Sequence, residues 1–297
     1  MNATPLVNAW IFLNEDQPPD TNYNSPNSCY QRLIQRAIYP SVDILNICFL
    51  TILPTSPKTV PPGDGSSYTL STGDPPPPHS GNLTNQDYML FTIRDSHRIN
   101  PRIKCTVTLQ YGDPNVIAQI FSNPKYPPQE NAARFAANLM TYLKTYKLDG
   151  FDIDWESPLS GGTSQDQFAM FVNAIGAQFK QQTNQHYYLT LSPNTTTHID
   201  PAAINNSVDF INFQLYADPQ LPSKYATMGV NSGLFAYGAL FETGFGQKTA
   251  EQAYQDNQVN YHFNVYTCWR LNSGNFVFEQ TQQQRLYQLV NPQRAVG

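Results

Sequence analysis

Eight short apolar segments recur along this chain, and they limit the folds that it can adopt. Each segment is nearly continuous in aliphatic, β-branched or aromatic residues, which is typical of parallel strands that are covered on both faces. The segments are Val7–Leu13, Val42–Leu50, Ile103–Gln110, Gly150–Trp155, Tyr187–Ser192, Val208–Leu215, Gly233–Phe241 and His262–Trp269. The sequence therefore predicts eight strands, with helical patterns in the chain between them.

The clearest of these helical patterns is Gln129–Tyr146, which follows Pro127 and Pro128, as is common at the start of a helix. Its apolar residues recur at intervals of three and four and so share one helix face. They are Ala132, Phe135, Ala136, Leu139, Met140 and Leu143. Similar patterns predict helices over Ser164–Lys180, Thr249–Gln258 and Phe278–Val290.

This alternation predicts an α/β fold, a single (β/α)8 TIM barrel over residues 1–297. Such a barrel takes about 250 residues, so one barrel uses nearly the whole chain. A doubly wound open sheet is the alternative. It normally has a glycine-rich turn after its first strand, where this chain has Leu-Asn-Glu-Asp-Gln-Pro-Pro.

The stretch 51–85 is rich in proline, glycine and serine, and it is too long for an ordinary connection between a strand and a helix. It follows the second predicted strand. It is therefore expected on the face where the strands end, which carries the active sites of such barrels. The insertion either shapes a substrate cleft or is an ordered excursion without function.

Charged residues make up only 13% of the chain, whereas tyrosine occurs 18 times. Such a surface suits sugar binding, because aromatic faces pack against pyranose rings and phenols pair with hydroxyl groups, although most individual aromatic residues are expected in the core. The net charge of −5, without a run of Lys or Arg, argues against nucleic acid or an anionic membrane as a partner.

The N-terminal sequence has no basic region followed by a long apolar core, and no stretch approaches the ~20 apolar residues of a membrane span. No signal peptide is predicted, and the localisation stays open, with extracellular action compatible with the sequence. The four cysteines, Cys29, Cys48, Cys105 and Cys268, lack metal-ligand spacing. Buried free thiols are expected, with a Cys48–Cys105 bridge as the alternative.

The segment Asp149–Glu156, Asp-Gly-Phe-Asp-Ile-Asp-Trp-Glu, points most directly to a chemistry. Side chains alternate along a strand, so Asp152, Asp154 and Glu156 share one face, and in a barrel they point inward. We call these three acids the carboxylate ladder. Carboxyl groups at steps of about 6.5–7 Å cannot all ionise cheaply in a low-dielectric interior. A shared proton is expected, which predicts that Glu156, the outermost acid, is protonated near neutral pH and acts as a general acid.

A metal site and a structural role are the two other interpretations of the carboxylate ladder. Asp-x-Asp-x-Glu is able to bind Mg²⁺ or Ca²⁺. The other strand ends offer few further acids, however, and the nearby histidines are His198 and His262. Three buried acids on one strand cost too much for a purely structural role. The sequence favours acid catalysis without a metal or other cofactor.

Residues Asp149–Glu156 also resemble the D-G-x-D-x-D-x-E signature of glycoside hydrolase family 18, a family of chitinases and endo-β-N-acetylglucosaminidases. The resemblance extends more weakly along most of the chain. Phe213–Tyr216 looks like the family's sixth-strand Q-x-Y motif, and Trp269 resembles the tryptophan that forms the floor of the cleavage subsite. The resemblance implies that Gln214 and Trp269 bind substrate and that Tyr216 takes part in catalysis. Asn194 and Tyr111, each just beyond a predicted strand, are further candidates for substrate binding.

Two positions depart from the family's pattern. Its third-strand S-x-G-G is Gln110–Asp113 here, which puts the polar support beneath Asp152 in doubt. The acid expected directly after Tyr216 is Ala217, with Asp218 one place later, which puts in doubt one contact to the N-acetyl group of a substrate. The short separation of the last two predicted strands also leaves no room for the extra α+β domain that some members insert there.

The resemblance implies a retaining glycoside hydrolase that cleaves β-1,4 bonds of N-acetylglucosamine-containing glycans, chitin or chitooligosaccharides, by substrate assistance. Glu156 would protonate the glycosidic oxygen while the substrate's own acetamido carbonyl attacks the anomeric carbon. Asp154 would accept the acetamido N–H, Asp152 would hold the proton that Asp154 gives up, and Tyr216 would donate to the acetamido carbonyl and orient it. Cleavage of N-glycans by an endo-β-N-acetylglucosaminidase and cleavage of peptidoglycan remain alternatives. So do a non-catalytic chitin-binding lectin and a subunit of a larger assembly such as a toxin complex.

Overall fold

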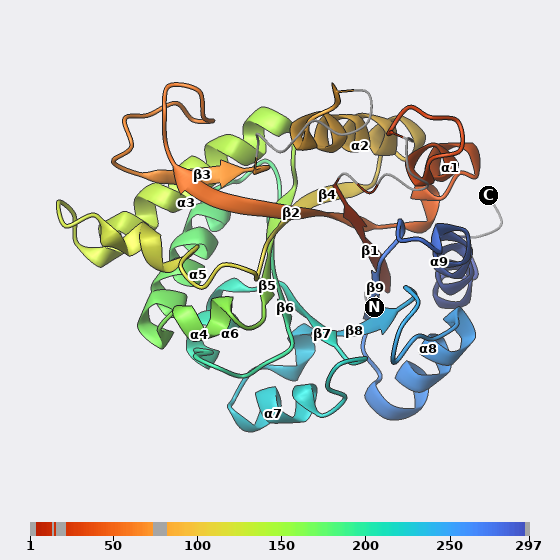
Figure 1. Cartoon of the computed structure of the whole chain (residues 1–297). Helices are drawn as coiled ribbons and strands as arrows, with labels where there is room; N and C mark the ends of the chain where they lie inside the picture. The colour runs from red at the N-terminus through yellow and green to blue at the C-terminus, as the bar shows by residue number, and fades with distance from the viewer. Residues whose placement is uncertain (1–3, 14, 16–21, 74–81, 295–297) are drawn as a thin grey trace.

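A computed structural model of the chain describes residues 4–13, 15, 22–73 and 82–294. Within these residues, nine strands form one sheet in the order β1-β9-β8-β7-β6-β5-β4-β2-β3, and β1 also pairs with β2, which closes a barrel of eight parallel strands. Figure 1 looks into this barrel, with the strands around the centre and the helices outside them. The predicted (β/α)8 TIM barrel is confirmed.

The barrel strands lie where the apolar segments predicted them, with ends that differ by a few residues. They are β1 (Leu6–Phe12), β2 (Ile44–Pro54), β4 (Lys104–Leu109), β5 (Gly150–Trp155), β6 (Tyr188–Pro193), β7 (Phe210–Gln214), β8 (Phe235–Leu240) and β9 (Val265–Trp269). The segment predicted from Val208 begins too early, because the backbone N–H of Val208 still bonds to Ile204 and ends the preceding helix.

The helices surround the barrel. They are α1 (Cys29–Gln35), α2 (Asn85–Ile99), α3 (Pro128–Tyr146), α4 (Leu159–Gly162), α5 (Gln165–Lys180), α6 (Pro201–Ser207), α7 (Leu221–Thr227), α8 (Ala250–Asp256) and α9 (Phe276–Val290), with short turns η1 (Tyr39–Ser41), η3 (Ala118–Ser122), η4 (Ser232–Leu234) and η5 (Asn257–Tyr261). The four predicted helices appear as α3, α5, α8 and α9. No helix in the described ranges is long and apolar enough to cross a membrane.

The chain between β8 and β9 holds only α8 and the single π-helical turn η5. Every residue of this connection is described. The expected absence of an inserted α+β domain therefore holds for this connection.

The insertion at residues 51–85 contains a strand that its composition did not predict. β2 runs on to Pro54 and pairs with the antiparallel β3 (Tyr68–Ser71). This hairpin lies over α3 (Figure 1), where Asn138 Nδ2 donates to the main-chain oxygen of Tyr68 at 2.9 Å. Residues 74–81, which include its run of prolines, lie outside the described residues.

The interior of the barrel changes character along its axis. At the ends where the strands begin, apolar side chains fill it, and we call this group the apolar plug. It consists of Ile44, Phe210 and Ala236 with Leu6, Tyr188 and Val265 packed against them. Farther along the strands the buried side chains are polar. They include Asn8, Asn46, Thr106, Asp152, Thr190, Asn212 and Thr267. The polar part of the interior therefore lies towards the face where the strands end.

The four cysteines are buried and free. Cys105 is paired with Leu45 in the sheet register, and its thiol lies 3.3 Å from the hydroxyl of Ser96 in α2. Cys48 shares the inward face of β2 with Asn46. Because the two thiols point to opposite faces of the barrel wall, the Cys48–Cys105 bridge considered from the sequence is wrong. Burial raises the pKa of Cys105 to about 12.

Candidate active site

β5 places the carboxylate ladder inside the barrel. The other face of this strand is fully buried beneath the helices, and it consists of Phe151, Ile153 and Trp155. With that face held, Asp152 and Asp154 point inward and are 0% and 5% exposed. Glu156 follows directly after the strand and is half-buried. The alternation along the strand therefore brings the three acids together, as the sequence predicted.

The first two residues of the motif hold the neighbouring strands together. A Cβ atom at Gly150 would lie 2.3 Å from the carbonyl oxygen of Tyr188, so a larger residue would separate β5 from β6. Asp149 pairs with Lys104 at 3.0 Å, and it accepts from the backbone N–H of Cys105 at 2.9 Å. These contacts give Asp149 and Gly150 a structural role at the end of the barrel remote from Glu156.

Asp152 is held by side chains of β6 and β7. Thr190 Oγ1 donates to Asp152 Oδ1 at 2.5 Å, and Ser192 Oγ lies 2.9 Å and 3.0 Å from its two oxygens. Asn212 Nδ2 lies 3.4 Å from Asp152 Oδ1 and donates to Ser192 Oγ at 3.1 Å. The altered third-strand motif, Gln110–Asp113, therefore does not leave Asp152 without polar support. The sequence contained a signal for these partners. Thr190 and Ser192 lie two residues apart on β6, as do Asn212 and Gln214 on β7, and this spacing places polar side chains on one face of a strand.

Gln214 joins the two outer carboxyl groups. Its Nε2 lies 3.2 Å from Asp154 Oδ1 and 2.5 Å from Glu156 Oε1. Asn194, just beyond β6, donates its Nδ2 to Glu156 Oε2 at 2.5 Å. Both oxygens of Glu156 are thus held by amide donors, which fix the carboxyl group at the end of β5. Gln214 and Asn194, considered from the sequence as substrate-binding residues, contact Glu156 in this structure.

Asp154, the middle acid of the ladder, favours its protonated form. Burial raises the pKa of Asp154 well above its ordinary value, and the charges of Glu156 and Asp152 raise it further, whereas the Gln214 amide lowers it. Burial also raises the pKa of Asp152, against hydrogen bonds that lower it. Asp154 also forms a hydrogen bond with Glu156, so the protonation of Asp154 depends on the charge of its neighbour. That Glu156 carries a proton into the reaction stays a prediction.

The two outer acids open into a pocket with a volume of about 260 Å³, below the ≈ 300–1,000 Å³ of drug-sized sites. Its lining residues are Trp10, Phe12, Phe49, Tyr111, Asp154, Glu156, Ser192, Gln214, Tyr216 and Trp269. The acids and Gln214 come from β5 and β7, while aromatic rings from β1, β2 and β9 line the remaining wall. Such a pocket suits a single ring with one apolar face and polar substituents.

The aromatic wall is built around Trp269. The centroid of its ring system lies 6.0 Å from that of Phe49 in a stacked arrangement, 5.8 Å from Phe12 and 6.1 Å from Trp10. Tyr111 lies 6.2 Å from Phe49 and is 38% exposed at the mouth of the pocket. The sequence singled out Trp269 and Tyr111 only. The others were missed because they lie inside apolar strand segments, although Trp10 and Phe12 share the inward parity of Asn8.

Tyr216 lies beside the two outer acids. Burial raises the pKa of its phenol, and the charges of Asp154, Glu156 and Glu242 add to the increase. The hydroxyl therefore stays protonated and able to donate a hydrogen bond. Asp218 does not replace the acid that is missing after Tyr216, because it pairs with Lys224 at 2.6 Å and does not line the pocket.

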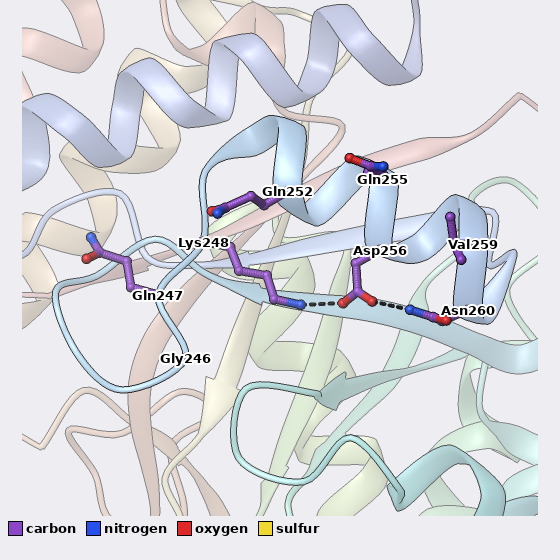
Figure 2. A pocket seen from close by; sticks show the side chains of 8 residues that line it. All are labelled: Gly246, Gln247, Lys248, Gln252, Gln255, Asp256, Val259 and Asn260. Atoms are coloured by element: carbon purple, nitrogen blue, oxygen red, sulfur yellow. Dashed lines mark hydrogen bonds and ion pairs between the residues drawn. The ribbon is translucent and has the colours of Figure 1, made fainter.

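A larger hollow of about 510 Å³ lies outside the barrel, beside β8 and α8 (Figure 2). Its charged groups bind one another. Lys248 pairs with Asp256 and lies 2.9 Å from the hydroxyl of Tyr237, and Asn260 Nδ2 donates to Asp256 Oδ1 at 2.7 Å. None of the ladder acids lines this hollow. The small pocket above the carboxylate ladder is therefore the candidate active site.

The described residues contain no group of three or more His, Cys, Asp or Glu side chains placed to hold a metal ion. His198 Nδ1 lies 2.9 Å and 2.7 Å from main-chain oxygens of Ser160 and Thr163 and so serves the turn around α4. At the ladder, the groups next to the Glu156 oxygens are amide nitrogens, whereas Mg²⁺ or Ca²⁺ would need further oxygen ligands there.

The model of one family, glycosyl hydrolases family 18, matches residues 23–291. The chain belongs to this family. The resemblance that its motifs carried is confirmed. Chitinase ChiA of Flavobacterium johnsoniae is 31% identical over 121 residues, which cover 38% of this chain and 7% of that protein. The chain spans less than a third of the length of the curated relatives that it matches.

Two solved structures, one of an enzyme and one of an agglutinin, have a similar fold. A fungal endo-β-N-acetylglucosaminidase from glycosyl hydrolase family 18 is 13% identical, with a TM-score of 0.66, over 98% of this chain and 100% of that one. A chitinase-like agglutinin from Robinia pseudoacacia is 12% identical, with a TM-score of 0.62, over 94% of this chain and 99% of that one. At these identities the likeness shows the fold.

Proposed function

We propose that this family 18 protein is a retaining glycoside hydrolase that cleaves β-1,4 bonds between N-acetylglucosamine units, in chitin or chitooligosaccharides, by substrate assistance. One observation carries the proposal. The two outer acids of the carboxylate ladder lie on one side of the pocket, and the other lining residues of the described structure carry no carboxyl group.

This placement does not suit a reaction that uses two carboxyl groups on opposite sides of the bond. Such glycosidases hold them about 5–5.5 Å apart for retention and about 6.5–9.5 Å apart for inversion, one on each side. Here Asp154 Oδ1 and Glu156 Oε1 both lie within 3.2 Å of the single atom Gln214 Nε2. The opposite wall is aromatic. The acetamido oxygen of the substrate is therefore the nucleophile that this pocket favours.

In the first step Glu156 donates its proton to the glycosidic oxygen, and the leaving sugar departs as an alcohol. The acetamido carbonyl oxygen of the sugar in the pocket forms a bond to its own anomeric carbon, which gives a cyclic oxazolinium ion. Glu156, now a carboxylate, then takes a proton from water as the water attacks the same carbon. Two inversions at that carbon leave the β configuration of the substrate unchanged.

The neighbours of Glu156 suit the charges that develop. Asp154 can accept the acetamido N–H and stabilise the positive ion once the proton between the two outer acids has moved to the leaving group in this step. Asp152 lies one step deeper, where hydrogen bonds from β6 and β7 support its charge. The protonated Tyr216 can donate to the acetamido oxygen and orient it, while Trp269 supplies the apolar floor.

The experiment incubates the protein with chitooligosaccharide, a high-mannose glycopeptide and peptidoglycan, and identifies the products by mass and the anomer first formed by NMR. Shortened chitooligosaccharides that first appear as β-anomers are expected. An initial α-anomer would exclude the substrate-assisted route. Release of the N-glycan alone would show that the protein is an endo-β-N-acetylglucosaminidase and not a chitinase. Release of peptidoglycan fragments alone would show that peptidoglycan is the substrate. Binding without any product would make the chain a lectin.

A further inference from the structure

The indole of Trp269 contacts a cluster of charged residues that the sequence did not predict. The indole Nε1 donates to Oε2 of Glu242, in the loop after β8, at 2.7 Å. Arg270 Nε and Nη2 each lie 3.2 Å from an oxygen of the same carboxylate. Arg270 Nη1 lies 2.8 Å from Oε2 of Glu15, beyond the end of β1. We call these three charged residues the rim cluster.

The rim cluster is more buried than an ordinary surface ion pair, and its arginine makes more contacts. The Arg270 side chain is only 10% exposed, and its guanidinium lies 4.5 Å from the centroid of the Phe12 ring. Its planar fork binds both oxygens of Glu242, a geometry that fixes direction as well as distance. Glu15 is held in turn, since its backbone N–H bonds to the hydroxyl of Tyr30 at 3.0 Å. The acceptor of the Trp269 indole therefore has a fixed place.

We infer that Glu242 is a positioning residue for Trp269, with Arg270 and Glu15 holding the carboxylate in place. A tryptophan that forms the floor of a sugar pocket must keep the plane of its ring against the sugar, and rotation of its side chain would tilt that plane. The bond to a fixed, charged acceptor opposes this rotation. The inference rests on the proposed function, because that function makes the orientation of Trp269 matter for sugar binding.

The test is a double-mutant cycle between the two partners. Glu242→Ala removes the acceptor, and Trp269→Phe keeps an aromatic ring but removes the N–H donor. Each single change is expected to raise the KM for a chitooligosaccharide about 10-fold, in line with one hydrogen bond to a charged group. The double variant should be no worse than Trp269→Phe alone, because the two changes break the same contact. Glu251→Ala, which breaks an exposed pair with Arg285, is the matched control and should leave KM unchanged.

Glu242→Gln separates positioning from a merely structural role. It keeps an oxygen acceptor for the indole and loses the charge that pairs with Arg270, so KM should return close to that of the wild type although Tm falls. If both Glu242 variants lower Tm without changing KM, or if the effects of Glu242→Ala and Trp269→Phe simply add, the inference is overturned. Should Glu242→Ala fail to fold, an unchanged KM in Trp269→Phe overturns it equally.

Tryptophan spectroscopy keeps this inference distinct from the proposed function. Glu242→Ala should change the near-ultraviolet circular dichroism of the chain, and the same substitution in the Trp269→Phe background should not. If the wild type cleaves none of the polymers but this spectral difference is present, the proposed function fails and the positioning of Trp269 stands. If the wild type is active and no such difference is found, the positioning fails alone.

Discussion

The side-chain amide nitrogen of Gln214 lies 2.5 Å from Oε1 of Glu156. The same nitrogen lies 3.2 Å from Asp154 Oδ1, so one donor from β7 sets the relative positions of the two acids at the end of β5. A shift of about 1 Å in a reacting group can cost about 100-fold in rate. The catalytic geometry proposed here therefore depends on a residue that itself transfers no proton.

Gln214→Leu should lower kcat for chitooligosaccharide about 10- to 100-fold, because Glu156 loses one of its two amide donors. The substitution should also raise the pKa of Asp154 further, since the Gln214 amide lowers it in the native protein. Steady-state kinetics measures the first effect. Gln255→Leu, on the exposed side of α8, is the matched control, and an equal loss in both variants would argue against a role of Gln214 in positioning the acids.

Glu156→Gln should lower kcat about 10²- to 10⁴-fold with little change in KM, because the amide is nearly isosteric but cannot act as an acid in the first step. Initial rates on a chitooligosaccharide measure this. Asp218→Asn removes a carboxyl group that pairs with Lys224 outside the pocket, and it should retain full activity. A Glu156→Gln variant with most of its activity would show that the acid has been assigned to the wrong residue.

Asp154→Asn should make the protein more stable near neutral pH while abolishing most of its activity. The pKa of Asp154 is raised in the folded chain, so above its ordinary value of 3.8 the unfolded chain releases this proton more readily, and the free energy of unfolding falls as pH rises. The variant has no carboxyl group at this position, so its free energy of unfolding does not decrease with pH in this way. Its Tm should exceed that of the wild type at about pH 7, and the difference should shrink towards about pH 4.

Thermal unfolding of both proteins at several pH values measures this difference. The matched variant Asp218→Asn should behave in the opposite sense, because the hydrogen bond to Lys224 lowers the pKa of Asp218 and so adds a small stability that disappears in acid. A Tm difference for Asp154→Asn that is constant with pH would contradict the raised pKa of Asp154.

Treatment with a chelator should leave kcat unchanged, since amide donors contact the oxygens of Glu156 and the described residues offer no metal-binding group. Activity measured before and after dialysis against the chelator tests this. Activity that is lost and then restored by Mg²⁺ or Ca²⁺ would return the Asp-x-Asp-x-Glu segment to the metal interpretation.

The sequence predicted the features of this protein that depend on local periodicity. The inward face of β5 follows from alternation within a single strand, and α3 follows from the spacing of its apolar residues. The expected free thiols are present, and the alternative Cys48–Cys105 bridge fails for a related reason. Neighbouring strands bring such residues close, but only the register decides that Cys48 and Cys105 point to opposite faces.

The features that the sequence did not predict depend on contacts between distant segments. β3 lies in an insertion rich in proline and glycine, and its four residues form a strand only because the extended end of β2 is there to pair with them. The rim cluster joins Glu15 to Glu242 and Arg270 from the other end of the chain, a relationship that no local pattern contains. The support of Asp152 likewise comes from two later strands.

The apolar plug has a consequence for how protons reach the carboxylate ladder. Ile44, Phe210 and Ala236 pack together at the end of the barrel beneath Asp152, whereas the two outer acids line the pocket at the other end. We therefore expect protons to exchange between the ladder and bulk water through the mouth of the pocket. A sugar bound in the pocket would block this exchange. The number of protons held by the three acids would then be set when substrate binds and would stay constant during bond cleavage. Acidity of the medium should accordingly govern kcat/KM, which reports the free enzyme, more strongly than kcat.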